Sequence, residues 1–188
     1  EGSYLPQSEQ IKFLETSLKY SEDNPDIDWV IVFFHRPIYT DGKNPSQIVL
    51  RNMLQPIFEK YDVALVLQGH NHVYERSAPL KFDSVQDPNG QVYVTVGTGG
   101  FSHEPFLKKS EWSLFQNNLD FGFLHLQLIL DGQKIKGDFI SNGGKILDSF
   151  ELCSSKIYDD VILYEELREK DLMCSDLSKM DLSGKDLT

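Results

Sequence analysis

Apolar residues recur at helical spacing in two segments of the chain. In residues 8–20 they lie on one face of a 3.6-residue period, and Ser8 suits the position of a helix cap. The pattern over residues 48–61 predicts a second amphipathic helix, and Pro45 before it suits a first helical position. Each helix should therefore pack through one face against the rest of the fold.

Two short segments are continuously apolar and rich in β-branched or aromatic residues. They are residues 29–34 (WVIVFF) and 63–67 (VALVL), and they flank the second predicted helix. Such segments are typical of strands buried on both faces in a parallel sheet, so residues 29–67 have the pattern of a βαβ unit. Residues 92–96 (VYVTV) predict a third strand, followed by the glycine-rich loop 97–100.

Beyond residue 120 the pattern changes to short strands joined by tight turns. Residues 123–130, 134–140 and 145–152 are separated by the turn sequences DG and NGG, which predicts an antiparallel meander. We therefore expect an α/β protein whose sheet has a parallel centre and antiparallel edge strands.

The composition argues against several classes of partner. The 188 residues carry 18 basic and 29 acidic side chains, a net charge of −11. Nucleic acids and anionic membranes are bound by basic surfaces, so neither partner is expected. The longest apolar run, residues 29–34, is far shorter than the roughly 20 residues of a membrane-spanning helix, so no spanning segment is expected.

The carboxyl-terminal segment differs from the rest of the chain. Residues 156–170 are acidic and predict a linker or a short helix. In residues 171–188 an Asp-Leu pair recurs every five residues, a spacing that resembles the pentapeptide-repeat proteins and implies the start of a short β-solenoid. An acidic disordered tail is the alternative.

Three of the five histidines follow the predicted parallel strands. His35 comes directly after the first strand, and His70 and His72 follow the second by a few residues. Because the carboxyl ends of neighbouring parallel strands meet at one edge of a sheet, these imidazoles should converge there. Imidazole is the commonest protein ligand for metals, so the pattern predicts a metal site. The alternative is that His35 and His70 are core residues and His72 lies on the surface.

The residues around these histidines resemble a known family. The tripeptide HRP that begins at His35 and the string GHNHVYER that begins at Gly69 are similar to motifs of the calcineurin-like metallophosphoesterase superfamily, in its purple acid phosphatase branch. The resemblance covers residues 4–152. It implies that residues 1–155 are the carboxyl-terminal half of a four-layer α/β/β/α metallophosphoesterase fold.

The resemblance also implies ligands, cofactors and a reaction. His35 and His70 would bind one metal ion and His72 a second, both of Fe, Zn or Mn type. In this family the two ions activate a hydroxide that hydrolyses a phosphomonoester in line, without a covalent enzyme intermediate. The purple acid phosphatase branch further implies an extracytoplasmic or secreted protein.

The family's first three ligand motifs precede the region that this chain matches. The resemblance therefore implies that the missing amino-terminal half of the domain is a partner, and that the isolated fragment is inactive or nearly so. Three imidazoles also fall short of the roughly four or more ligands that each of two ions requires. No general acid is identified.

Four further residues are weaker candidates for the surroundings of the metal or the substrate: Tyr74, Glu75, Arg76 and His103. Glu75 and Arg76 are expected to pair near the metal, with a surface ion pair as the alternative. His103 lies in a loop and is a candidate to contact a bound phosphate, with an ordinary loop position as the alternative. His125 alternates with apolar residues, so we expect a structural role for it.

Two other functions remain open. One is a mononuclear zinc hydrolase that uses His35, His70 and His72 and is complete within this chain. The other is a non-catalytic interaction module that acts through the Asp-Leu repeats of residues 171–188.

Overall fold

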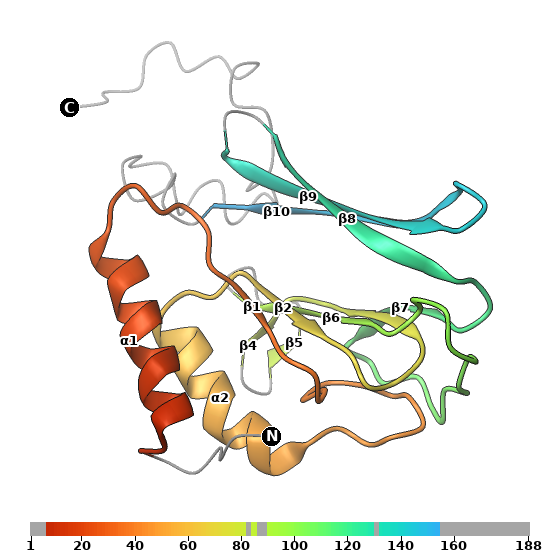
Figure 1. Cartoon of the computed structure of the whole chain (residues 1–188), viewed down its shortest axis with the longest axis horizontal. Coiled ribbons are helices and arrows are strands. Elements are labelled where there is room, and N and C mark those ends of the chain that lie inside the picture. The colour runs from red at the N-terminus through yellow and green to blue at the C-terminus, as the bar shows by residue number, and fades with distance from the viewer. Residues whose placement is uncertain (1–6, 82–83, 86–89, 130–131, 155–188) are drawn as a thin grey trace.

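The computed structural model describes residues 7–81, 84–85, 90–129 and 132–154. They form two helices, α1 (Glu9–Asp23) and α2 (Ile48–Lys60), and ten strands (Figure 1). In chain order the strands are β1 (Ile31–Phe33), β2 (Leu65–Gln68), β3 (Tyr74–Ser77), β4 (Leu80–Lys81), β5 (Ser84–Val85), β6 (Val92–Val96), β7 (Ser113–Asn117), β8 (Gly122–Ile129), β9 (Lys134–Ser141) and β10 (Ile146–Cys153).

Five strands form the central sheet, in the order β1-β2-β6-β3-β7. β1 pairs with β2 and β2 with β6 in parallel, whereas β3 is antiparallel to both β6 and β7. The three parallel strands are those that the apolar pattern predicts, and the register aligns Leu65 with Ile31 on one side and with Val92 on the other. The parallel strands extend to one edge of the sheet, however, so the expectation of a parallel centre between antiparallel edges is wrong.

Helices α1 and α2 cover one face of the central sheet (Figure 1). Ile11 of α1 and Leu54 and Phe58 of α2 pack in one apolar core with Val66 of β2. The expected cap of α1 is confirmed, because the Ser8 hydroxyl accepts a hydrogen bond from the N–H of Ile11 at 3.4 Å. The helices thus hold the parallel strands in place from one side.

A second sheet lies on the other face, with the antiparallel order β10-β9-β8 (Figure 1). The core between the sheets contains Leu65, Val92 and Val94 of the central sheet and Phe139 and Phe150 of the second. The predicted meander is confirmed. The described residues therefore stack as helices, sheet and sheet, in keeping with the predicted mixed α/β fold.

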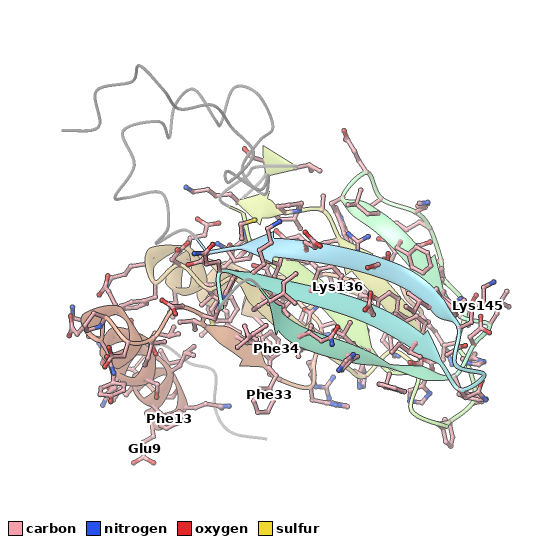
Figure 2. All side chains as sticks on the ribbon, turned by 90° about the horizontal axis from the view of Figure 1, so that it is seen from above. Glu9, Phe13, Phe33, Phe34, Lys136 and Lys145 are labelled. Atoms are coloured by element: carbon pink, nitrogen blue, oxygen red, sulfur yellow. The ribbon has the colours of Figure 1, made fainter. Side chains whose placement is uncertain are left out.

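The prediction that residues 29–34 form a strand buried on both faces is wrong for one face. β1 is an edge strand, and Figure 2 shows Phe33 lying beyond the edge of the second sheet. Phe33 is 81% exposed and Ile31 is 38% exposed, whereas Leu65 and Val66 of β2 are fully buried. Of these two strands, only β2, which has a neighbouring strand on each side, has residues that are fully buried.

The second predicted helix is confirmed as α2, but Pro45 is not its first helical residue. α2 starts at Ile48 because the preceding loop is fixed by Ser46. The Ser46 hydroxyl accepts from the N–H of Thr40 and donates to the carbonyl of Thr40, both at 2.9 Å. These two bonds close the loop before the helix can begin.

The expected acidic linker (residues 156–170) and Asp-Leu repeats (residues 171–188) lie outside the described residues. No helix in the described part of the chain is long and apolar enough to cross a membrane.

Candidate metal centre

Two of the predicted histidines meet where adjacent parallel strands end. Backbone pairing of β1 with β2 continues past both strands, because the N–H of Gly69 donates to the carbonyl of His35 at 3.1 Å. The side chains then converge, with Nδ1 of His70 3.2 Å from Nε2 of His35. The ring centroids are 5.1 Å apart and the ring planes meet at 82°. The structure thus brings His35 and His70 together.

The chain turns twice in quick succession after β2. The N–H of Asn71 donates to the carbonyl of Gly69 at 2.8 Å, and the N–H of Val73 donates to the carbonyl of Asn71 at 2.9 Å. Each bond closes a three-residue turn, with His70 and His72 as the central residues. His70 has a φ of 67°, which is uncommon for a non-glycine residue and typical of the rarer, strained form of this turn. The two imidazoles therefore leave the backbone at the tips of separate turns.

His72 is held by the loop of residues 101–104. Its Nδ1 lies 3.2 Å from the carbonyl oxygen of Ser102, which only accepts hydrogen bonds, so Nδ1 carries the proton. The ring packs against Phe101 with centroids 4.9 Å apart, and the backbone N–H donates to Oε2 of Glu104 at 3.2 Å. Nε2 is then the ring atom with a lone pair. A backbone carbonyl commonly orients metal-binding histidines in this way.

The three histidines do not form one cluster. In the described part of the chain, no group of three or more His, Cys, Asp or Glu side chains is arranged to hold an ion. This geometry does not support the mononuclear three-histidine alternative. Two imidazoles that bind one tetrahedral zinc ion at about 2.0–2.1 Å stand about 3.3 Å apart. The 3.2 Å between His35 and His70 fits such a distance.

Glu75 and Arg76 do not pair with each other, and the expectation that they do is wrong. Both lie in β3, and successive side chains of a strand point to opposite faces. Arg76 faces the second sheet, where Nε and Nη2 donate to Asp148 at 2.7 and 2.9 Å. Glu75 is only 1% exposed and lies on the opposite face.

The Glu75 carboxylate accepts four hydrogen bonds inside the protein. Oε2 accepts from the Thr40 hydroxyl at 2.8 Å and from the N–H of Asp41 at 2.9 Å. Oε1 accepts from the Ser113 hydroxyl at 2.7 Å and from the Gln116 amide at 3.2 Å. Burial raises the pKa of Glu75, and the four donors oppose that rise. Glu75 is therefore a buried anchor for the loop that follows His35.

The other two weak candidates pack against aromatic rings. Tyr74 lies between the sheets, where its ring stacks on Phe139 with centroids 4.0 Å apart and its hydroxyl donates to Asp148 at 2.8 Å. Burial raises the pKa of Tyr74. His103 stacks on Phe121 with centroids 4.1 Å apart, and its buried Nε2 has no hydrogen-bond partner among the described residues. Tyr74 thus joins the two sheets.

The loop of residues 39–46 is the part of the site that the sequence analysis missed. The Asp41 side chain is fully buried and accepts hydrogen bonds from the N–H and the hydroxyl of Ser110 at 2.5 and 2.8 Å. Asn44 pairs with Asn71, which lies between two of the candidate ligands. Each partner is far away in the chain, and a polar segment with Gly and Pro otherwise has the composition of an ordinary turn.

Comparisons with known proteins match the segments that carry these residues. The family model for calcineurin-like phosphoesterases matches residues 3–74, which contain all three candidate ligands. A second family model, described as iron/zinc purple acid phosphatase-like protein C, matches residues 90–149. These two matches and the relatives below support a relationship to the calcineurin-like phosphoesterase superfamily. Within this superfamily, both the second model and the relatives below connect the chain to the purple acid phosphatases.

Three matches illustrate the relationship. The chain is 30% identical over 179 residues to "Probable inactive purple acid phosphatase 1" of Arabidopsis thaliana, over 86% of this chain and 28% of that protein. It is 28% identical over 179 residues to "Nucleotide pyrophosphatase/phosphodiesterase" of Hordeum vulgare, over 86% of this chain and 48% of that protein. The structure of purple acid phosphatase PPD1 from yellow lupin (Lupinus luteus) seeds matches with a TM-score of 0.72 and 28% identity, over 80% of this chain and 29% of that one. This chain spans less than half the length of each of these three.

Proposed function

We propose that this chain is part of a metal-dependent phosphoesterase that hydrolyses phosphomonoesters. His35 and His70 bind one ion of Fe, Zn or Mn type, and His72 binds the second ion of a dinuclear centre. The observation that carries the proposal is the 3.2 Å approach of His70 Nδ1 to His35 Nε2 at the ends of adjacent parallel strands. The match to purple acid phosphatases, which use dinuclear metal centres, supports the number of ions.

The protein's own part in this chemistry is to present imidazole lone pairs. Metal ions polarise phosphate oxygens and increase the acidity of water, so they supply the nucleophile and stabilise developing charge. His35 and His70 bind one ion when their facing nitrogens are both unprotonated, with the protons on His35 Nδ1 and His70 Nε2. On His72 the Ser102 carbonyl keeps the proton on Nδ1, so Nε2 is the binding atom.

The proposal requires ligands beyond these three imidazoles, since each ion needs roughly four or more. We place them in the amino-terminal part of the same domain, outside this chain, because the matches cover less than half of each relative. An apolar groove of about 770 Å³ beside His35, lined by Phe33, Phe34 and Phe123 among others, is the surface that such polypeptide would cover. The chain alone is then expected to hydrolyse phosphate esters little or not at all.

Metal binding by the 188-residue chain tests the ligand pair. We expect titration calorimetry with Zn²⁺ to detect binding that becomes at least about tenfold weaker in His70→Ala, because removal of one imidazole leaves a single ligand at that ion. His125→Ala is the matched control, since His125 is exposed on β8. Equal Zn²⁺ affinity in the His70→Ala and His125→Ala chains would overturn the assignment.

Hydrolysis assays test the reaction. In the chain alone, the rates for p-nitrophenyl phosphate should be the same for wild type and His70→Ala. In a polypeptide extended to the whole domain, we expect metal-dependent hydrolysis that His70→Ala abolishes. Faster hydrolysis of bis(p-nitrophenyl) phosphate than of the monoester would overturn the choice of phosphomonoesters. Two bound ions without hydrolysis of either ester would contradict the enzymatic proposal and favour a non-catalytic family member.

A further inference from the structure

Asn71 separates the two histidines His70 and His72, yet its own side chain points into the protein. It is 0% exposed. Its Oδ1 accepts from the backbone N–H and from the side-chain amide of Asn44, at 2.8 and 2.9 Å. Its Nδ2 donates to the carbonyl of Asn44 at 2.9 Å and to the hydroxyl of Thr40 at 3.0 Å. All four hydrogen-bonding positions of the amide are therefore used.

The bonds to Asn44 define the orientation of the Asn71 amide. Both the N–H and the carbonyl of Asn44 pair with it, as they would with a neighbouring strand. A rotated amide would face donor with donor and acceptor with acceptor. The Asn71 side chain thus ties the turn that carries the two candidate ligands to the loop that follows His35.

Thr40 and Glu75 extend the hydrogen bonds of the Asn71 side chain further into the protein. The Thr40 hydroxyl donates to Oε2 of Glu75 at 2.8 Å and accepts from Asn71 Nδ2 and from the N–H of Gly42, each at 3.0 Å. Because its only proton is directed at the Glu75 carboxylate, its lone pairs must face Asn71 and Gly42. A chain of hydrogen bonds with a fixed direction therefore runs from Glu75 through Thr40 to Asn71.

Backbone contacts close the space around Asn71 from two sides. A Cβ atom on Gly42 would lie 2.7 Å from Cγ of Asn71, and one on Gly97 would lie 1.9 Å from its carbonyl oxygen. Both glycines thus allow other segments to approach Asn71 more closely than a side chain would permit. The turn is packed as well as hydrogen-bonded.

We infer that Asn71 is the positioning residue for His70 and His72, and that Thr40 and Glu75 fix Asn71 through their hydrogen bonds. The inference rests on the proposed metal site. The strained φ of 67° at His70 needs such support, since an uncommon backbone conformation persists only where its surroundings hold it. Asn71 touches neither ion in this scheme. It acts by holding the two turns whose tips carry the ligands.

Histidine ring NMR of the 188-residue chain, without metal, tests the inference directly. In wild type we expect the Nδ1–H tautomer for His72 and a contact between the rings of His35 and His70. Asn71→Ala and Thr40→Val should lose the ring contact, whereas Thr40→Ser, which keeps the hydroxyl, should retain it. Asn52→Ala, at an exposed position on α2, is the control. Unchanged ring signals in Asn71→Ala and Thr40→Val would overturn the inference, whatever their stability.

Zn²⁺ binding gives a second readout. Loss of a residue that orients metal ligands typically weakens binding by about 10–100-fold, and we expect this for Asn71→Ala and Thr40→Val but not for Thr40→Ser. If wild type binds no Zn²⁺, the proposed ligand pair fails, while the ring signals still decide the role of Asn71. If the variants do not fold, hydrogen exchange of side-chain amide protons in the wild-type chain tests whether Asn71 is held in place. The Asn71 side-chain amide protons should exchange far more slowly than those of Asn52, and equal rates would contradict the inference.

Discussion

Arg76 and Asp148 join the two sheets. Nε and Nη2 of Arg76 donate to Oδ2 and Oδ1 of Asp148 at 2.7 and 2.9 Å, and the side chains are only 15% and 6% exposed. The hydroxyl of Tyr74 donates to the same carboxylate at 2.8 Å. Since Arg76 and Tyr74 belong to β3 and Asp148 to β10, three charge-assisted hydrogen bonds cross the core between the sheets.

Asp148→Ala should destabilise the protein strongly, because it leaves Arg76 and Tyr74 buried without their acceptor. Loss of one partner of a buried ion pair typically costs about 3–5 kcal/mol, and we expect a loss of this size in urea unfolding. Lys19→Ala is the control, since Lys19 forms an exposed pair with Asp23 at 2.6 Å and its loss should change stability little. Equal unfolding midpoints for the two variants would show that the sheets are held by apolar packing alone.

The strands and the histidine pair were predictable because their signals are local. A continuous apolar run predicts a buried strand, and β2 and β6 lie where such runs occur. The convergence of His35 and His70 follows from the strand ends on which they lie. The exposure of one face of β1 was not predictable from its own residues, because it depends on how far a separate sheet extends over Phe33.

The surroundings of the site were not predictable because their contacts join distant segments. Glu75 and Arg76 are adjacent in sequence and oppositely charged, which suggests an ion pair. Because both lie in one strand, however, their side chains point to opposite faces of the sheet. Their partners Thr40 and Asp148 lie 35 and 72 residues away in the chain. No periodicity or motif identifies such partners, and none identifies Thr40 and Asn44 as the partners of Asn71.

Stability should depend on pH through Glu75. Burial raises the pKa of this carboxyl above its ordinary value of 4.5, so the folded state holds the proton more tightly than the unfolded state does. The contribution of Glu75 to stability is therefore largest at low pH. It should fall as pH rises from 4.5 through the raised pKa of the folded state. Glu75→Gln stays neutral and should lack this decline.

Urea unfolding of wild type and Glu75→Gln between about pH 4.5 and 8 measures this difference. All other ionisable groups are common to both proteins, so the difference between the two curves isolates Glu75. Parallel curves for wild type and Glu75→Gln would mean that the four hydrogen-bond donors fully offset the burial of the carboxylate.

Phe33→Ser should reduce self-association with little effect on stability. Phe33 is 81% exposed and lines the apolar groove beside His35, and contiguous exposed apolar surface favours association. Because the side chain is mostly in solvent, unfolding free energy should change by no more than about 0.5 kcal/mol. Sedimentation velocity at increasing concentration measures the effect. The control is Phe13→Ser, at a 73% exposed residue of α1 outside the groove lining, and this variant should associate as wild type does. Equal self-association of the Phe33→Ser and Phe13→Ser variants would contradict this role of the groove.

The two glycines Gly97 and Gly99 belong to the same loop, yet they should respond oppositely to substitution by alanine. A Cβ on Gly97 would lie 1.9 Å from the carbonyl oxygen of Asn71, whereas one on Gly99 meets no atom within 4 Å. Gly97 also donates its N–H to the carbonyl of Val73 at 2.9 Å, so it cannot move away without releasing the turn that carries His72. Overpacking of this kind typically costs about 1–3 kcal/mol, so Gly97→Ala should lower the free energy of unfolding by at least about 1 kcal/mol.

Gly99→Ala should be neutral or stabilise by up to about 1 kcal/mol, since alanine restricts the unfolded chain and fits the open space. The decisive comparison combines unfolding free energies with the ring signals of His72. Gly97→Ala should alter both, because the clash falls on the residue between the two candidate ligands, and Gly99→Ala should alter neither signal nor fold. If Gly97→Ala were as stable as Gly99→Ala with His72 unchanged, the loop would be free to move away from Asn71. The close approach of the two segments would then not be what holds the histidines.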